Sequence, residues 1–161
     1  MRYKPALSLE QQASRAKNAV AEFLSRQLIV PKVFVNAPWP DERTRVDVLA
    51  VDRSGAGEVH VVEVKVGTQV LAPGAFVSVM QIPAHFKYVA VFENSNSSAD
   101  ESDLYARDGM GRVGVIQVKE DDSGDLSAEF RVRPERFRFD ASFKQVDRFT
   151  ASHQADIEIR P

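Results

Sequence analysis

The sequence predicts a mixed α/β fold in which helices pack around one sheet. Three observations support this prediction. Apolar residues recur at helical spacing near the N-terminus, several later runs are rich in valine and other β-formers, and turn-forming residues separate those runs. The resulting order is a helix, three strands, a helical segment, a strand, a short helix and two strands, which suits a sandwich built around a single sheet.

The first helix is predicted by a capping signal. Ser8 followed by Gln11 resembles a capping box, in which each residue satisfies a free backbone amide at the helix start. The helix runs for about 20 residues, and we expect it to end before Pro31 because proline disfavours helical backbone in the preceding residue. Its apolar positions are Ala16, Val20, Phe23, Leu24 and Leu28.

The next three elements are predicted strands. A short strand at 32–36 is halted by A-P-W-P, where Trp39 either stacks on a base or anchors the turn, and we favour the anchor. Longer strands at 45–52 and 58–66 are joined by R-S-G-A-G, and turn residues between two β-branched runs predict a hairpin.

The remaining elements are less regular. The segment 68–86 suits a helix, but Pro73 and Pro83 restrict it to a short or interrupted one. Further along the chain we expect a buried strand at 88–92, a short helix at 100–107, and a second hairpin formed by 112–119 and 126–133.

Length and composition limit the class of protein. The 161 residues suit one domain over 1–161, with 139–161 as a peripheral helix or a loose tail. The absence of cysteine excludes disulfides and thiolate metal sites, and the three histidines lack the spacing of a zinc site. A site for Mg²⁺ or Mn²⁺ built from oxygen ligands remains open.

Two further properties concern location and partners. The N-terminus has no apolar stretch resembling a signal peptide, and no run of about 18 apolar residues occurs, so we expect a cytoplasmic protein with no membrane partner. The net charge of −2 gives no overall attraction to nucleic acid, so any such binding requires a local patch.

Three charged residues stand in apolar strands. Glu63 and Lys65 lie two apart in V-H-V-V-E-V-K-V, which places them on one face ~7 Å apart. Asp47 lies in the preceding strand. Strict alternation puts three apolar residues on the same face as these charges. Burial of a charge is costly unless the charge is paired or bound. Those apolar residues are Leu49, Val51 and Val61.

This pattern suits the chemistry of phosphodiester cleavage. Two carboxylates on neighbouring strands, Asp47 and Glu63, can hold a divalent ion, with the backbone carbonyl of Val64 as a further ligand. Lys65 can then orient the attacking water and stabilise charge on the phosphate. The alternative is a cross-strand ion pair on a solvated face, which contributes only ~0.2–1 kcal/mol.

The pattern Asp47, then Glu63-x-Lys65 sixteen positions later, resembles the motif of the PD-(D/E)-x-K nuclease superfamily. The resemblance covers roughly residues 10–92. It implies a restriction-endonuclease-like α-β-β-β-α-β core with a mixed central sheet, here with a C-terminal β-hairpin extension. It also implies a Mg²⁺- or Mn²⁺-dependent endonuclease or exonuclease acting on DNA, or less readily on RNA. Val46 stands where the motif has proline.

Two accessory residues follow from the same resemblance. Many members place a carboxylate on the first helix, where Glu22 is the candidate, although a helical wheel turns it almost opposite the apolar face. Relatives also carry a polar residue on the helix after the lysine. Gln81 is the best match, but Pro83 lies close by.

A basic run could contact nucleic acid. In R-V-R-P-E-R-F-R the arginines are interspersed with apolar residues, which suits either phosphate contacts or the protected face of an edge strand. The candidates are Arg131, Arg133, Arg136 and Arg138. Of the histidines, His60 is expected to pack structurally and His85 to lie at the surface.

A second function class stays open. The acidic net charge, the small size and the weak first-helix carboxylate also suit a catalytically inactive nuclease-fold module that binds nucleic acid or a protein partner. Homodimerisation is common among enzymes that cut both strands, but no residue pattern in this chain predicts it.

Overall fold

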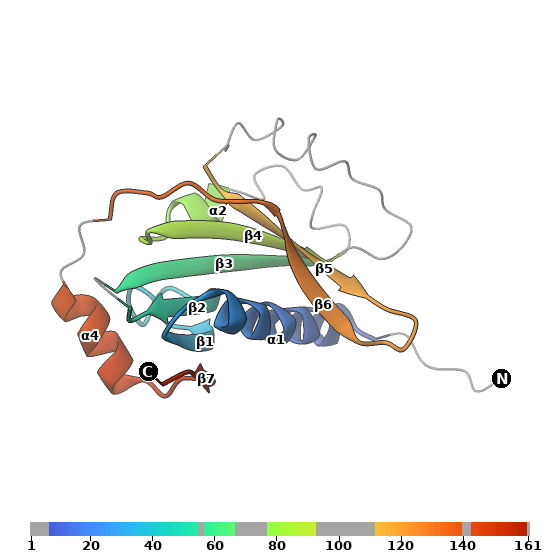
Figure 1. The fold of residues 1–161 in the computed structure, drawn as a ribbon, viewed down its shortest axis with the longest axis horizontal. Coiled ribbons are helices and arrows are strands. Elements are labelled where there is room, and N and C mark those ends of the chain that lie inside the picture. The colour runs from blue at the N-terminus through green and yellow to red at the C-terminus, as the bar shows by residue number, and fades with distance from the viewer. Residues whose placement is uncertain (1–6, 55–56, 67–76, 93–111, 140–142, 161) are drawn as a thin grey trace.

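The computed structural model describes residues 7–54, 57–66, 77–92, 112–139 and 143–160 (Figure 1). Its centre is one seven-stranded sheet in the order β6-β5-β4-β3-β2-β1-β7. The elements are α1 (Leu9–Gln27), β1 (Pro31–Ala37), β2 (Val46–Asp52), β3 (Glu58–Val66), α2 (Val77–Met80), β4 (Phe86–Phe92), β5 (Gly114–Glu120), β6 (Leu126–Val132), α4 (Phe143–Ser152) and β7 (Ile157–Glu158).

Helix α1 begins at the predicted capping box. The Gln11 amide donates to Ser8 Oγ at 3.1 Å, and the Ser8 amide donates to Gln11 Oε1 at 2.9 Å. The helix ends where Leu28 becomes extended, and the Leu28 amide still donates to the Leu24 carbonyl. Both predicted limits of this helix are therefore confirmed.

The sheet is mixed. Strands β1, β2 and β3 pair antiparallel, β3 and β4 pair parallel, and β4 and β5 pair parallel. Strand β6 returns antiparallel to β5 as the predicted second hairpin, and β7 pairs antiparallel with β1. The prediction of an α/β protein with a mixed sheet is confirmed, and the order from α1 to β4 is helix, three strands, helix, strand.

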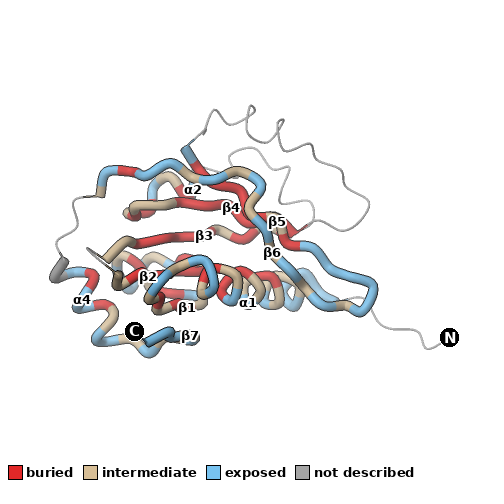
Figure 2. The backbone as a smooth tube through the Cα atoms, in the orientation of Figure 1, coloured by how far each residue is buried: buried red, intermediate tan, exposed pale blue. Residues whose placement is uncertain are grey.

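Each face of the sheet carries its own apolar core. Helix α1 covers one face, where it contacts β1, β2, β3, β5, β6 and β7, while α2 and α4 contribute to the core on the other face. Figure 2 shows the central strands buried along most of their length and the turn of the β5–β6 hairpin exposed. The α1 core contains Ala16, Val20, Ala21, Leu24, Val33, Val48, Ala50, Val62, Val64, Ala90 and Ile116.

Trp39 anchors the turn after β1, as favoured from the sequence. Its ring is fully buried, and Nε1 donates to the Pro83 carbonyl at 2.8 Å. The ring also meets Phe139 and Phe149 edge-to-face. Because the indole is enclosed and its only donor is satisfied, this side chain belongs to the core.

Residues 143–160 dock on the sheet instead of forming a loose tail. Val146 and Phe149 of α4 are buried in the core opposite α1, and the Asp156 amide donates to the Val33 carbonyl. The chain then forms β7, which was not predicted because two residues are too short to show a strand period.

Two helix predictions fall wholly or partly outside the described residues. Within 68–86, only Val77–Met80 is helical among the described positions, and 67–76 lie outside them. The helix expected at 100–107 also lies outside the described ranges. No helix in the described part of the chain is both long and apolar enough to cross a membrane.

Candidate functional site

The β2–β3 hairpin brings Asp47 and Glu63 near each other at one end of its ladder. The last antiparallel pair is Val48 with Val62, and Asp47 and Glu63 are the next residues on their strands. The regular ladder stops there. The Val64 amide donates at 2.6 Å to Asp47 Oδ2, so a side chain takes the place of the next backbone acceptor.

A lysine from α1 completes this arrangement. Lys17 Nζ lies 3.2 Å from Asp47 Oδ1 and donates at 2.9 Å to Asn36 Oδ1. Sequence reasoning missed Lys17, because it considered only carboxylates on this helix. A signal was present, since Lys17 lies three and four positions before Val20 and Ala21 and therefore flanks the buried stripe of the helix.

A break in strand alternation aims Asp47 at α1. Asn36 has a positive φ of 54°. Val35 and its partner Val48 pack in the α1 core, whereas Ala37 and its partner Val46 pack in the opposite core. Residues two apart on one strand normally share a face, so the alternation is broken in both strands between these two pairs. The prediction for Asp47 assumed unbroken alternation, which fails here: the Asp47 carboxylate lies between the Val64 amide of β3 and the Lys17 ammonium of α1.

Glu63 and Lys65 lie on one face, as predicted. Their charged atoms are 3.9 Å apart, and Glu63 is the less exposed of the two side chains, at 16% against 25%. Burial raises the pKa of the Glu63 carboxyl, and the nearby Asp47 charge raises it further, while Lys65 and Lys17 partly oppose this effect. The carboxylates are thus close enough to repel each other, and each has a lysine beside it.

The donor set suits a hard cation. Asp47 and Glu63 offer oxygen ligands, and Mg²⁺ typically takes one or two carboxylates and completes its shell with waters and substrate oxygens. In an antiparallel ladder a residue's amide and carbonyl face the same neighbour, so the Val64 carbonyl faces β2 as its amide does. Within the described ranges, no group of three or more His, Asp or Glu side chains forms a metal cage.

The two accessory candidates lie elsewhere. Glu22 is on the outer surface of α1, where it is 66% exposed and pairs with Arg26 at 3.8 Å, in agreement with the helical wheel. Gln81 is exposed and follows the end of α2. The chain after Gln81 contacts β3 near Val59, where the His85 amide donates to the Val59 carbonyl. Val59 lies at the opposite end of β3 from Lys65.

The four candidate arginines follow the exposed side of β6 and the segment after it. The apolar residues interspersed with them or directly after them, Val132, Phe137 and Phe139, face the core opposite α1. Arg131 contacts Gln117 and Glu129, and Arg136 pairs with Glu58 at 3.3 Å. Arg133 lies over the Phe130 ring, and Arg138 is exposed.

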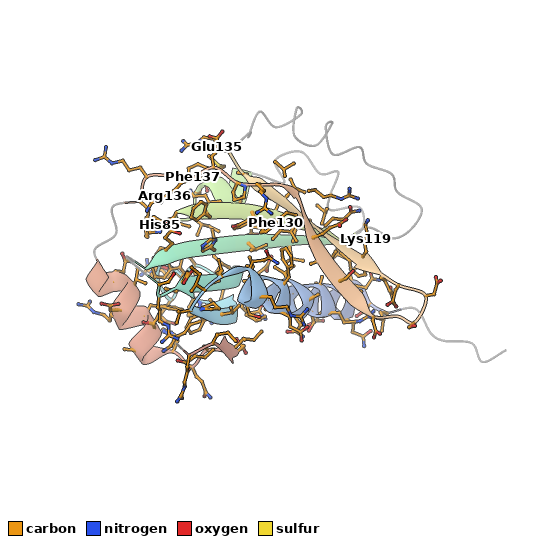
Figure 3. The ribbon with its side chains drawn as sticks, viewed as in Figure 1. His85, Lys119, Phe130, Glu135, Arg136 and Phe137 are labelled. Carbon is orange, nitrogen blue, oxygen red and sulfur yellow. The ribbon has the colours of Figure 1, made fainter. Side chains whose placement is uncertain are left out.

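Figure 3 shows Arg136 and Phe137 beside His85 near the start of β4, with Phe130 and Lys119 farther along the sheet. The Phe137 amide donates to the His85 carbonyl at 2.7 Å, which ties the arginine segment to this end of the sheet. Because β6 is the terminal strand, both interpretations of the arginines, phosphate contact and edge protection, fit its position.

The histidines have structural roles. His60 is buried, stacks on Phe86 at 4.7 Å between ring centroids, and places Nδ1 3.0 Å from the Tyr88 hydroxyl. His85 accepts a 2.9 Å hydrogen bond from the Val59 amide through Nδ1, so it is less of a surface residue than expected. His60 is packed as predicted.

Comparisons with known proteins identify no relative with an assigned function. No family model matches the chain, and no curated protein matches it. One solved structure, of a protein of unknown function from Silicibacter pomeroyi, is similar with a TM-score of 0.54 and 18% identity over 90% of this chain and 84% of that one. At that identity the likeness concerns the fold alone.

Proposed function

We propose that this protein is a metal-dependent nuclease of the PD-(D/E)-x-K type that hydrolyses phosphodiester bonds in DNA, with RNA as the other substrate class. The observation that carries the proposal is the proximity of Asp47 and Glu63 at the end of the β2–β3 ladder, with Lys65 on the face of Glu63. The order α1-β1-β2-β3-α2-β4, with β3 parallel to β4, supports the restriction-endonuclease-like core that the motif implies.

Each residue of the site has a proposed role. Asp47 and Glu63 hold Mg²⁺ or Mn²⁺, with the Val64 carbonyl as a further ligand. When bound, the ion polarises the phosphate and lowers the pKa of a water. Lys65 orients that water and stabilises the negative charge that develops on the phosphate. Arg131, Arg133, Arg136 and Arg138 then contact backbone phosphates along the nucleic acid.

One observation favours a second candidate function. Both oxygens of the Asp47 carboxylate already have partners, one in the Lys17 ammonium and one in the Val64 amide. A carboxylate held in this way can serve as a structural latch between α1 and the hairpin. The protein would then be a catalytically inactive module of the same fold that binds nucleic acid or a protein partner.

A panel of labelled substrates tests the two candidates. Duplex, single-stranded and branched DNA, and RNA, are incubated with Mg²⁺, with Mn²⁺ or with chelator. Cleavage that requires metal and stops with chelator supports the nuclease. If no form is cut and calorimetry detects no Mn²⁺ binding, the inactive module is the better assignment. The Asp47→Asn variant is the control for contaminating nuclease, because it keeps the shape of the side chain without its charge.

A further inference from the structure

We propose that Lys17 is the resident counter-ion of Asp47 and that a divalent cation must displace its ammonium group to bind. This inference rests on the proposed metal-dependent function and concerns how the same site is regulated. It makes Lys17 a positioning residue whose release from Asp47 accompanies metal binding.

The first argument is the placement of the ammonium group. Lys17 Nζ is 3.2 Å from Asp47 Oδ1, while Asp47 Oδ2 accepts the Val64 amide. A cation that binds Asp47 through Oδ1 therefore approaches the oxygen that the ammonium already contacts. Since two positive charges on one oxygen repel strongly in a partly buried site, the ammonium and a metal ion compete.

The second argument is the backbone that supports this contact. Asn36 adopts a positive φ of 54°, a conformation that costs energy for a residue other than glycine, and its Oδ1 accepts a 2.9 Å hydrogen bond from Lys17. The same break in alternation turns Asp47 toward α1. Two strands thus depart from regular geometry at the positions that receive the lysine, and the ammonium is held from two sides.

The third argument is charge balance. The site holds two carboxylates, Asp47 and Glu63, and two ammonium groups, Lys17 and Lys65. The set is neutral without metal, which allows it to be partly buried. Addition of a divalent cation leaves an excess of two positive charges unless an ammonium withdraws. Lys17 is 20% exposed and has a long flexible stem, so it can swing toward solvent.

The test is Mn²⁺ affinity by isothermal calorimetry, in the absence of nucleic acid. Lys17→Met removes the competing charge but keeps the length of the side chain. We expect it to bind Mn²⁺ about two- to fivefold more tightly than the wild type, the scale of one partly exposed ion pair. Lys17→Arg keeps the charge and should remain close to the wild type.

Lys32→Met is the matched control. Lys32 is 21% exposed and pairs with Glu158 at 3.7 Å, so its exchange removes the same charge from a similar ion pair at the β1–β7 edge. We expect its Mn²⁺ affinity to equal that of the wild type. A gain in Lys32→Met as large as in Lys17→Met would mean that net charge alone sets the affinity, and it would overturn the displacement.

Asn36→Gly provides an independent variant in case Lys17→Met is unstable. Glycine adopts positive φ without strain, and this exchange removes the oxygen that holds the ammonium from its second side. We expect an affinity between those of the wild type and Lys17→Met. Weaker or unchanged binding in both variants, with clear binding by the wild type, overturns the displacement and leaves the nuclease proposal standing.

A different pattern identifies failure of the proposed function itself. If the wild type, Lys17→Met and Asn36→Gly all fold but none binds Mn²⁺, the metal site is absent and the displacement falls with it. Binding by Lys17→Met alone supports the displacement, because the resident ammonium then excludes the ion from the wild type.

Discussion

Lys65 Nζ lies 3.9 Å from Glu63 Oε2, at the long end of an ion pair, whereas Lys17 Nζ lies 3.2 Å from Asp47 Oδ1. The two lysines beside the two carboxylates are therefore held differently. Lys17 is tied to Asp47 and Asn36, while Lys65 has one long contact and a quarter of its side chain in solvent. Lys65 is thus the less constrained of the two lysines.

Replacement of Lys65 by alanine should strongly reduce cleavage. In the proposed mechanism the Lys65 ammonium stabilises charge on the phosphate, and loss of one preorganised donor of this kind costs on the order of 10²-fold in rate. The measurement is the single-turnover rate with saturating Mg²⁺. Lys32→Ala is the control, because it removes an equal charge far from the site. Full Mg²⁺-dependent activity in Lys65→Ala would rule out the assigned role.

Acid should weaken the fold through His60. Burial lowers the pKa of His60 to about 4, and His85 contributes in the same direction while Asp52 opposes it. Between about pH 6.5 and pH 4 the unfolded chain takes up a proton on this residue that the folded chain does not. The stabilisation is therefore fully present above pH 6.5 and is lost as the pH falls toward 4.

The size of this effect is measurable. At ~1.4 kcal/mol per pH unit, the difference between 6.5 and about 4 corresponds to roughly 3 kcal/mol of unfolding free energy. Urea unfolding at several pH values should show this slope in the wild type and a smaller one in His60→Phe. The Tyr88 hydroxyl loses its partner in that variant, but this cost is the same at pH 4 and 6.5.

Local signals explain which parts of the fold the sequence predicted. The Ser8–Gln11 box and the two hairpins depend on residues close in the chain, and all three are present. The proximity of Asp47 and Glu63 also follows from the hairpin, whose last pair, Val48 with Val62, directly precedes them. These features need no knowledge of the rest of the molecule, so single-sequence reasoning reaches them.

The missed features depend on distant contacts. The positive φ of Asn36 breaks a strand that looks regular in sequence, and only the packing of α1 against β1 and β2 shows why Lys17 meets Asp47. Strand β7 exists because it completes the β1 edge, not because of its own two residues. Contacts between distant parts of the chain therefore determine both the position of Lys17 beside Asp47 and the pairing of β7 with β1.

Replacement of Trp39 by phenylalanine should lower stability without affecting nucleic-acid binding. The buried Nε1 donates to the partly buried Pro83 carbonyl, and loss of such a hydrogen bond costs on the order of 1 kcal/mol. Denaturant unfolding measures this loss. Binding to labelled DNA, measured well below the unfolding midpoint, should match the wild type. A selective loss of DNA affinity with unchanged stability would instead support base stacking by Trp39.

The arginine segment can be tested through salt dependence. Each phosphate contact contributes about 0.9 to the slope of log affinity against log salt on duplex DNA. Arg133→Gln and Arg138→Gln leave the Glu58 and Glu129 ion pairs in place, because Arg136 and Arg131 make those pairs. Each exchange should lower the slope by about one and weaken binding to all sequences alike.

Arg43→Gln is the control for this measurement. Arg43 is exposed in the loop before β2, where the neighbouring Glu42 contacts His153 beyond α4, so it lies away from β6. Its exchange removes the same charge and should leave the slope unchanged. If Arg133→Gln and Arg138→Gln behave like this control and their variants aggregate more readily, the arginines protect the exposed edge of β6 and the nucleic acid follows another surface.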